Sequence, residues 1–253
     1  MNELIRGFFY HYTSIEKLTL ILNSQNIRFT RADLVNDLEE INIIDKPEIK
    51  KSAFISCWTS QNNESIPMWN LYGGISKGVR IKLRYPIFEG ASVAYNVENH
   101  HCNIMNLKNI SNFIKRDGDH EWVKYLFGPI KVNYAKNVAV YVIGNNNSLI
   151  VEKIGTQKLE HWKFENESRF LALANHEWNS STKQFELKQE PYYSKTKDNY
   201  FDIRIDKNIF NKMEVTLGPS CQYPEQIIVE SLIEKFTTNG KVKLSELKEK
   251  IRL

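Results

Sequence analysis

Short runs of apolar residues, some continuous and some alternating with polar ones, recur along the chain and predict β-strands. These runs are rich in aromatic and β-branched residues, and Gly, Pro, Asn or Asp residues separate several of them. We expect strands at residues 7–13, 26–30, 52–58, 77–83, 129–134, 165–174, 200–205 and 213–219. The long polar stretch 175–199 predicts a loop or a hairpin.

Helical periodicity occurs in fewer segments. Thr13 and Glu16 form a T-x-x-E capping box before a helical stripe, and Ser65 is expected to begin a short helix that ends at Gly73–Gly74. Further helical patterns cover residues 103–116, 224–236 and 243–253. This mixture predicts one α+β domain over residues 1–253, with mixed or antiparallel sheets and the C-terminal helices of residues 224–253 packed on it.

Composition and charge narrow the class of protein only slightly. The 253 residues are 42% hydrophobic and 25% charged, as in an ordinary globular protein, and the net charge of +4 does not require a nucleic-acid partner. The three cysteines form no CxxC motif, which argues against a zinc site or a disulfide framework. Without a signal peptide or a long apolar run, we expect a cytoplasmic protein that does not bind membranes.

The stretch WKFENESRF, residues 162–170, carries the most distinctive charge pattern. In a strand, Glu165, Glu167 and Arg169 would share one face within an aromatic frame. Such a strand could be a solvated edge with a weak Glu–Arg pair. Alternatively, two adjacent carboxylates could act on a sugar centre, one stabilising positive charge and the other orienting the acceptor, while the arginine keeps them ionised or holds a phosphate.

Polar residues at strand ends and turns form a second set of candidates. His11, Tyr12 and Thr13 end the first expected strand. They could form hydrogen bonds to a ligand there, or they could simply belong to the core and to the cap of the following helix. Asn36 and Asp37 favour a turn that could border a pocket.

Aromatic and hydroxyl side chains form a third set. Ser56, Trp58 and Ser60 alternate along an expected strand, and Trp69 and Tyr72 share one face of an expected helix. Together they could enclose a flat heterocycle, or they could simply be core residues. Cys57, in the same strand, is interpreted as a buried hydrophobic residue and not as a nucleophile. Phosphate-loop, dinucleotide-fingerprint, HExxH and GxSxG motifs are missing, and His100–His101 lacks a metal-ligand partner, so no metal site is expected.

The order of these motifs resembles a widespread bacterial domain family of unknown function. The motifs are FYHYTS, NDLEE, FISCWTS, MWNLYGGISKGVRIKL, WKFENESRF and VTLGPSC, over roughly residues 9–225. NDLEE departs from the family pattern, which has proline after the position of Asp37. That pattern in turn resembles the ADP-ribosyltransferase fold, with His11 matching its first strand, Ser56 its middle strand, and Glu165 and Glu167 its E-x-E.

The resemblance implies a cleft between two small sheets that binds NAD as substrate. His11, Glu165 and Glu167 would be catalytic, with Glu167 on the ribose and Glu165 toward the acceptor. The NAD-binding residues would be His11, Tyr12, Thr13, Asn36, Asp37, Ser56, Trp58, Ser60, Trp69, Tyr72 and Arg169. The acceptor would be water, a protein or a nucleic acid. The biological role would be that of a toxin or a phage-defence effector, with a cognate antitoxin or defence partner.

Two other functions remain open from the residues alone. Aromatic and basic residues together suit a non-catalytic module that binds a nucleotide or single-stranded nucleic acid. The paired carboxylates could also serve a metal-dependent nuclease or sugar hydrolase, with Asp37, Glu39 and Glu40 as extra ligands.

Overall fold

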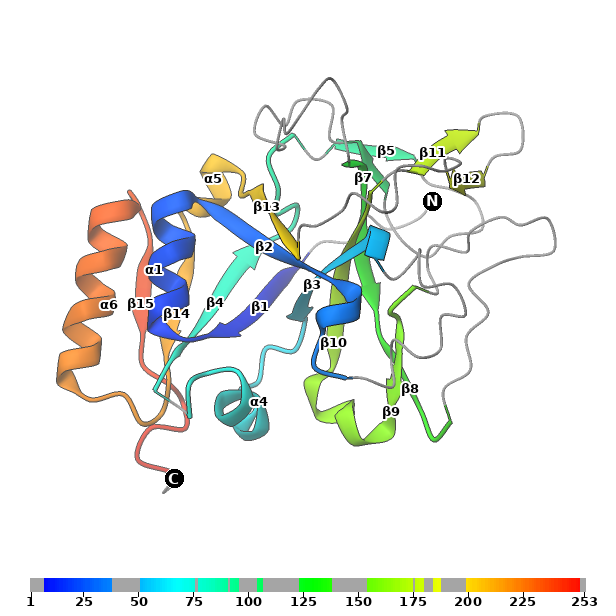
Figure 1. Ribbon diagram of the computed structural model, residues 1–253. Helices are drawn as coiled ribbons and strands as arrows, with labels where there is room; N and C mark the ends of the chain where they lie inside the picture. Colours follow the sequence, from blue (N-terminus) through cyan, green and yellow to red (C-terminus); the bar gives the residue numbers. More distant parts are fainter. Residues whose placement is uncertain are drawn as a thin grey trace.

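The computed structural model describes residues 7–37, 51–75, 77–90, 92–95, 104–106, 123–137, 154–174, 176–179, 184–187 and 199–250. It is a mixed α/β structure in which strands predominate, as expected (Figure 1). The strands are β1 Phe8–Thr13, β2 Asn26–Arg31, β3 Ala53–Thr59, β4 Val79–Arg84, β5 Ser92–Tyr95, β6 Ile104–Asn106, β7 Val123–Lys131, β8 Asn133–Ala135, β9 Gln157–Leu159, β10 Glu167–Ala174, β11 His176–Asn179, β12 Gln184–Leu187, β13 Tyr200–Arg204, β14 Glu214–Leu217 and β15 Lys241–Lys243. The helices are α1 Ile15–Ser24, α4 Ile66–Leu71, α5 Lys207–Phe210 and α6 Tyr223–Phe236, with 3-10 turns η1 Ala32–Leu34 and η3 Glu160–Glu165.

In the described part of the chain, eleven strands form one large, mostly antiparallel sheet, where the resemblance to the ADP-ribosyltransferase fold implies two small ones. Its order is β15-β14-β4-β1-β3-β10-β7-β6-β5, and β2 joins β3 to β13 at a branch. The pairs β11–β12 and β8–β9 form separate two-stranded sheets. The large sheet is continuous because Tyr10 of β1 pairs with Thr59 of β3, the one register pair that these two strands share. By contrast, β1 pairs with β4 along its whole length.

Helices α1 and α6 lie side by side over the end of the sheet that contains β4 and β14 (Figure 1). The residues Leu18 and Leu22 of α1 and Val229 and Ile233 of α6 are buried in the same core as the apolar residues of those strands. Burial of such side chains is the main source of fold stability. The same core contains Phe9 of β1, Phe29 of β2 and Phe54 of β3, so it also fixes strands that carry part of the candidate site.

Two short helices start at serine caps. Ser65 caps α4 as expected, and its side chain accepts a hydrogen bond from the backbone of Met68. For α1 the cap is Ser14, which accepts from the backbone N–H of Lys17, so the expected capping box at Thr13 is off by one residue. Thr13 instead remains in β1, where it pairs with Val79.

Two of the expected helices are not helical in the residues that the structure describes. Residues 241–243 pair in parallel with β14, and residues 246–250 form turns, so the helix expected over residues 243–253 is wrong up to residue 250. Ile104–Asn106, within the helix expected over residues 103–116, pairs with β5 and β7, and residues 107–116 lie outside the described residues. In both cases pairing with neighbouring strands satisfies backbone groups that a helix would have satisfied internally. The polar stretch 175–199 contains the hairpin β11–β12.

Candidate active site

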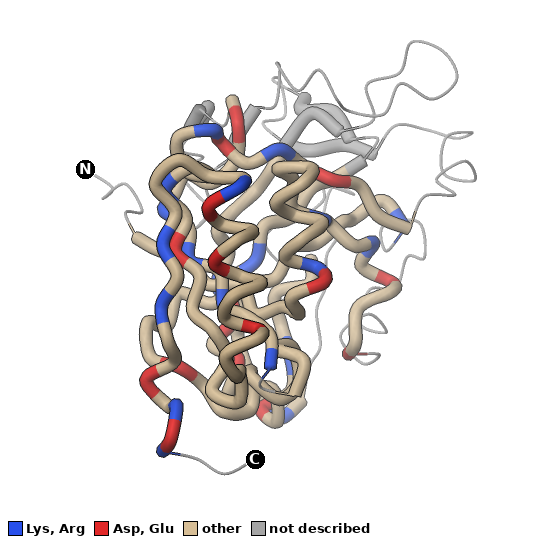
Figure 2. Tube along the Cα trace, turned by 90° about the vertical axis from the view of Figure 1, so that its left-hand side faces the viewer, with Lys and Arg blue, Asp and Glu red and all other residues tan. Residues whose placement is uncertain are grey.

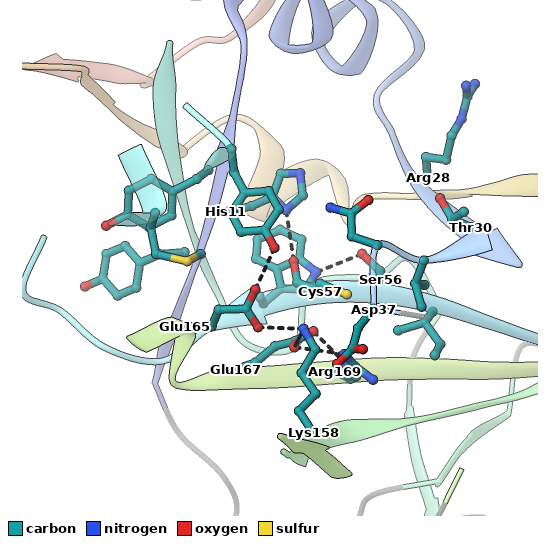
Figure 3. A pocket seen from close by; sticks show the side chains of 18 of the residues that line it. His11, Arg28, Thr30, Asp37, Ser56, Cys57, Lys158, Glu165, Glu167 and Arg169 are labelled. Atoms are coloured by element: carbon teal, nitrogen blue, oxygen red, sulfur yellow. Dashed lines mark hydrogen bonds and ion pairs between the residues drawn. The ribbon is translucent and has the colours of Figure 1, made fainter. Parts of the chain in front are cut away.

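A cavity of about 240 Å³ lies where β1, β3 and β10 meet. The strand β2 and the turn after it, with α4 and η3, complete its walls (Figure 3). The described residues that line it are Tyr10, His11, Tyr12, Arg28, Thr30, Leu34, Val35, Asn36, Asp37, Ile55, Ser56, Cys57, Trp58, Met68, Tyr72, Lys158, Glu165, Glu167 and Arg169. Polar and charged side chains thus share the cavity with aromatic ones, as is usual for a small-molecule site.

The two glutamates reach this cavity by a route that the sequence did not predict. Glu165 ends the 3-10 turn η3, whereas Glu167 begins β10, so the strand expected over residues 165–174 starts only at Glu167. Between them Asn166 adopts a left-handed conformation with φ of 42°, which asparagine tolerates better than most residues. Its carbonyl accepts a 3.0 Å hydrogen bond from Thr59, while the backbone N–H of Glu167 donates to the Tyr134 hydroxyl at 2.8 Å. These contacts hold the turn against the sheet.

Lys158 of β9 links the two carboxylates. Its Nζ lies 2.6 Å from Oε2 of Glu165 and 3.0 Å from Oε2 of Glu167, and all three side chains are almost completely buried. The ammonium group also lies 4.9 Å from the centre of the Trp162 ring. A shared cation is what allows two carboxylates to remain adjacent in a buried place.

Arg169 forms the second half of this ion-pair cluster. Its Nε and Nη2 donate to the two carboxylate oxygens of Glu167 at 2.6 and 2.9 Å, and Nη1 donates to the carbonyl of Gly155. Burial lowers the pKa of Arg169 to about 9, while the nearby charge of Asp37 opposes the shift, so the guanidinium stays charged at neutral pH. Arg169 is therefore committed to Glu167 and is not open to the cavity as a free anion-binding group.

The pKa of Glu167 lies near neutrality. Burial raises the pKa of Glu167 to about 7, the positive charge of Lys158 opposes this rise, and the charge of Glu165 adds to it. Burial by itself lowers the pKa of Lys158, but the charges of Glu167 and Glu165 raise it above the usual value of a lysine. At neutral pH Lys158 is thus a fixed cation, while Glu167 can gain or lose a proton.

His11 of β1 and Tyr72, which follows α4, also line the cavity. The hydroxyl of Tyr72 donates a 2.6 Å hydrogen bond to Oε1 of Glu165. Burial lowers the pKa of His11 despite its bond to the Cys57 carbonyl, so the ring is neutral at pH 7. Because His11 Nδ1 lies 3.0 Å from that carbonyl and must donate to it, Nε2 is left as an acceptor.

Cys57 departs from the expectation of a buried hydrophobic residue. It is the one exposed residue of β3, whose other six residues are buried, and its side chain opens into the cavity. The protein surrounding this cavity still desolvates the thiol. Together with the charge of Glu167, this raises the pKa of Cys57 well above its usual value. The thiol is therefore protonated at neutral pH.

The structure brings together ten of the residues that the sequence predicts for the site. These are His11, Tyr12, Asn36, Asp37, Ser56, Trp58, Tyr72, Glu165, Glu167 and Arg169. Ser56 and Trp58 are themselves nearly buried and bonded to each other, the indole N–H donating to the serine hydroxyl at 3.0 Å.

Three of the expected residues do not line the cavity. Thr13 is buried in β1, and Ser60 is exposed just after β3. Trp69 is completely buried and donates its indole N–H to Glu64 at 2.8 Å. Trp69 therefore lies in the core and Tyr72 lines the cavity, so the two do not form the expected aromatic face.

Several cavity residues were not among the candidates, namely Tyr10, Arg28, Thr30, Met68, Lys158 and Cys57. Tyr10, next to His11 in the same expected strand, could have been suspected from its position. Lys158 carries no such signal, because it lies in a separate strand and in no recognised motif. Arg28 points away from the carboxylates and forms a bidentate pair with Asp202 at 3.0 and 3.2 Å (Figure 3).

Comparisons with known proteins place this chain in no family. No protein-family model, curated protein or solved structure matches the chain. Within the described ranges, no helix is long and apolar enough to cross a membrane. The same ranges contain no group of three or more His, Cys, Asp and Glu side chains that could hold a metal ion.

Proposed function

We propose that the protein is an NAD-consuming enzyme that breaks the bond between nicotinamide and ribose. The ADP-ribosyl group would pass to water or to a protein or nucleic-acid acceptor. The observation that carries this proposal is the buried pair of Glu165 and Glu167, which opens into a cavity that His11 and Tyr72 also line. The fold would be that of an ADP-ribosyltransferase, and the single register pair between β1 and β3 supports a cleft at this point of the sheet.

The charge of the cavity supports a substrate that carries or develops positive charge. Among the described residues that line it, the buried charged groups are the three carboxylates Asp37, Glu165 and Glu167 and the two cations Lys158 and Arg169, while the exposed Arg28 is paired with Asp202. When all are ionised, one negative charge is in excess. Oxidised NAD has a cationic pyridinium ring, and the departure of nicotinamide leaves positive charge on the ribose. An excess of negative charge in a cavity that excludes water stabilises both the pyridinium ring and the positive charge on the ribose.

Each residue then has a definite part in the reaction. Glu167 accepts a hydrogen bond from a ribose hydroxyl and stabilises the positive charge at C1′. Glu165, held by Tyr72 and Lys158, orients the acceptor and takes its proton. The neutral His11 offers Nε2 as an acceptor to a hydroxyl group of the nucleotide. Ser56 and Trp58 form the part of the wall beside His11, whose ring centre lies 5.1 Å from that of Trp58.

Nicotinamide release from NAD tests the proposal directly. In Glu167→Gln, which keeps the size of the side chain, release should fall by roughly 100-fold or more, as when a transition-state stabilising group is removed elsewhere. Glu160→Gln is the matched control, because Glu160 begins the 3-10 turn η3 that precedes Glu167, and its side chain is exposed. Equal release by wild type and Glu167→Gln would overturn the proposal, as would the lack of both nicotinamide release and stabilisation by NAD.

A non-catalytic nucleotide-binding module is the second candidate. The observation that favours it is that both carboxylate oxygens of Glu167 already bind cations. NAD would then raise the melting temperature of the protein without losing nicotinamide. A nucleic-acid surface has less support: on the face of α1, α6 and β15 shown in Figure 2, basic and acidic positions interleave and form no continuous basic stripe.

NAD loss is a chemistry suited to bacterial conflict, and a role as a toxin or phage-defence effector is part of this proposal. An antitoxin or defence partner would then be expected to close the cavity or to control access to it.

A further inference from the structure

The thiol of Cys57 is a potential nucleophile in the cavity wall, and the reaction outlined above does not use it. It projects from the face of β3 that also carries Thr59, toward the side on which β10 presents Glu167 and Arg169. Figure 3 shows Cys57 among Glu165, Glu167 and Lys158. A thiol in this position faces whatever group the carboxylates bind.

Strand register places a base next to this thiol. Cys57 is directly opposite Arg169 in the antiparallel pair β3–β10, so Glu167, two residues earlier, is its diagonal neighbour on the same face. Diagonal neighbours are within reach of long side chains. Burial and the neighbouring Glu167 carboxylate raise the pKa of the thiol, while Lys158 and Arg169 hold that carboxylate in place. The arrangement is a nucleophile, a base that can take its proton, and cations that fix the base.

Protonation supports the same division of roles. The thiol is neutral at pH 7 because burial and Glu167 raise its pKa, so it is not present as a thiolate before the reaction begins. The pKa of Glu167 is about 7, which suits a group that must accept a proton and return it near neutrality. Sulfur therefore becomes nucleophilic only as its proton moves to Glu167.

We propose that Cys57 attacks C1′ of the nicotinamide ribose and forms a covalent S-glycosyl enzyme; this rests on the proposed NAD cleavage. In the first step the S–C1′ bond forms and the C1′–N bond breaks. Its electron pair stays with nicotinamide, which leaves neutral, and the thiol proton passes to Glu167. In the second step the acceptor oxygen bonds C1′, its proton passes to Glu165, and the departing sulfur regains the proton from Glu167. Two displacements give net retention of configuration at C1′.

A slow substrate can trap this intermediate. The 2′-deoxy-2′-fluoro-arabino analogue of NAD keeps nicotinamide as the leaving group, while fluorine destabilises the positive charge of both steps, so the covalent enzyme accumulates. Intact-mass measurement should show the gain of one fluorinated ADP-ribosyl group, and peptide mapping should place it on Cys57. The mapping also distinguishes Cys57 from Cys102, which lies outside the described residues, and from Cys221.

Variants make the test specific. Cys57→Ala and Cys57→Ser should lose the adduct, and nicotinamide release from NAD should be lost with it. Cys221→Ala is the matched control, because Cys221 is buried, does not line the cavity, and lies against the carbonyls of Lys77 and Gly78. It should form the adduct like wild type, and circular dichroism would verify that all three variants are folded.

The outcomes separate this inference from the proposed function. Nicotinamide release that persists in folded Cys57→Ala, or an adduct on Glu165 or Glu167, overturns the role of Cys57 and leaves NAD cleavage intact. No release by wild type from either dinucleotide overturns both. An adduct on Cys57 that disappears in Cys57→Ala and persists in Cys221→Ala establishes the thiol as the nucleophile.

Discussion

Lys158 donates a 2.6 Å hydrogen bond to Glu165 in a place where both side chains are almost completely buried. The same ammonium group holds Glu167 at 3.0 Å, so one lysine neutralises charge on two neighbouring acids. Removing it leaves negative charge without its main counter-ion. This single residue therefore links the stability of the fold to the ionisation of the candidate site.

Lys158→Met is expected to lower the free energy of unfolding by about 3–5 kcal/mol, the usual cost of removing one partner from a buried ion pair. Urea denaturation at neutral pH would measure it. Lys163→Met is the matched control, because Lys163 is an exposed lysine of the neighbouring 3-10 turn, and it should change stability by no more than about 0.5 kcal/mol. Equal stability of Lys158→Met and wild type would show that the cluster has no structural role.

Stability should depend on pH through Glu167. Burial raises the pKa of this residue from 4.5 to about 7, so between these values the folded protein binds a proton more tightly than the unfolded chain. The stability gained from this proton is complete below pH 4.5 and is lost as the pH rises through about 7. Wild type should lose up to about 3 kcal/mol relative to Glu167→Gln across this range.

Denaturation of both proteins at several pH values would measure that difference. The lowered pKa of His11 acts with the opposite sign, because stability then rises with pH, but it does so in both proteins and cancels in the comparison. A difference between wild type and Glu167→Gln that stays constant with pH would show that Glu167 ionises in the folded protein as it does in the unfolded chain.

Nicotinamide release should rise with pH and level off above about 7, because the proposed reaction needs ionised Glu167, whose pKa lies near that value. Initial rates at saturating NAD would define the profile. A rate that falls as the pH rises through neutrality would contradict the part assigned to this carboxylate.

Tyr72→Phe removes the hydroxyl that bonds Glu165 at 2.6 Å. Burial and this carboxylate raise the pKa of Tyr72, so the group is protonated and donates its hydrogen throughout the neutral range. Its loss should cost about 1–2 kcal/mol in the free energy of unfolding, since the bond is to a charged acceptor at a half-buried position. Tyr223→Phe changes an exposed tyrosine and should be neutral in the same denaturation experiment.

Substitutions at Asn166 test how much the backbone conformation of the turn between Glu165 and Glu167 contributes to stability. Its φ of 42° is unfavourable for a residue with a Cβ, so Asn166→Ala should lose about 1 kcal/mol of stability, whereas Asn166→Gly should lose less. Thermal denaturation of the two variants would compare them. Both variants lose the 3.5 Å contact between the Asn166 side chain and Gln61, so the reverse order would mean that the left-handed backbone conformation does not limit the stability of this turn.

Local pattern was sufficient for much of the fold. The first strand, the Ser65 cap and the strands near residues 200–217 are confirmed, since each depends on residues close together in the sequence. The helix expected from residue 243 onward is wrong at its first residue, because Lys243 belongs to β15, a strand that exists only through pairing with β14. Propensity contains no information about such a distant partner.

The sequence by itself determined the mixed α/β class and the residue types that surround the cavity, because periodicity and caps are local properties. Only the tertiary structure decided that Lys158 lies between the two acids, that Cys57 opens into the cavity, and that Trp69 belongs to the core. These outcomes depend on strand register and on a turn at Asn166. Strand register and chain direction depend on contacts between segments far apart in the chain. The local sequence pattern of one segment therefore does not predict them.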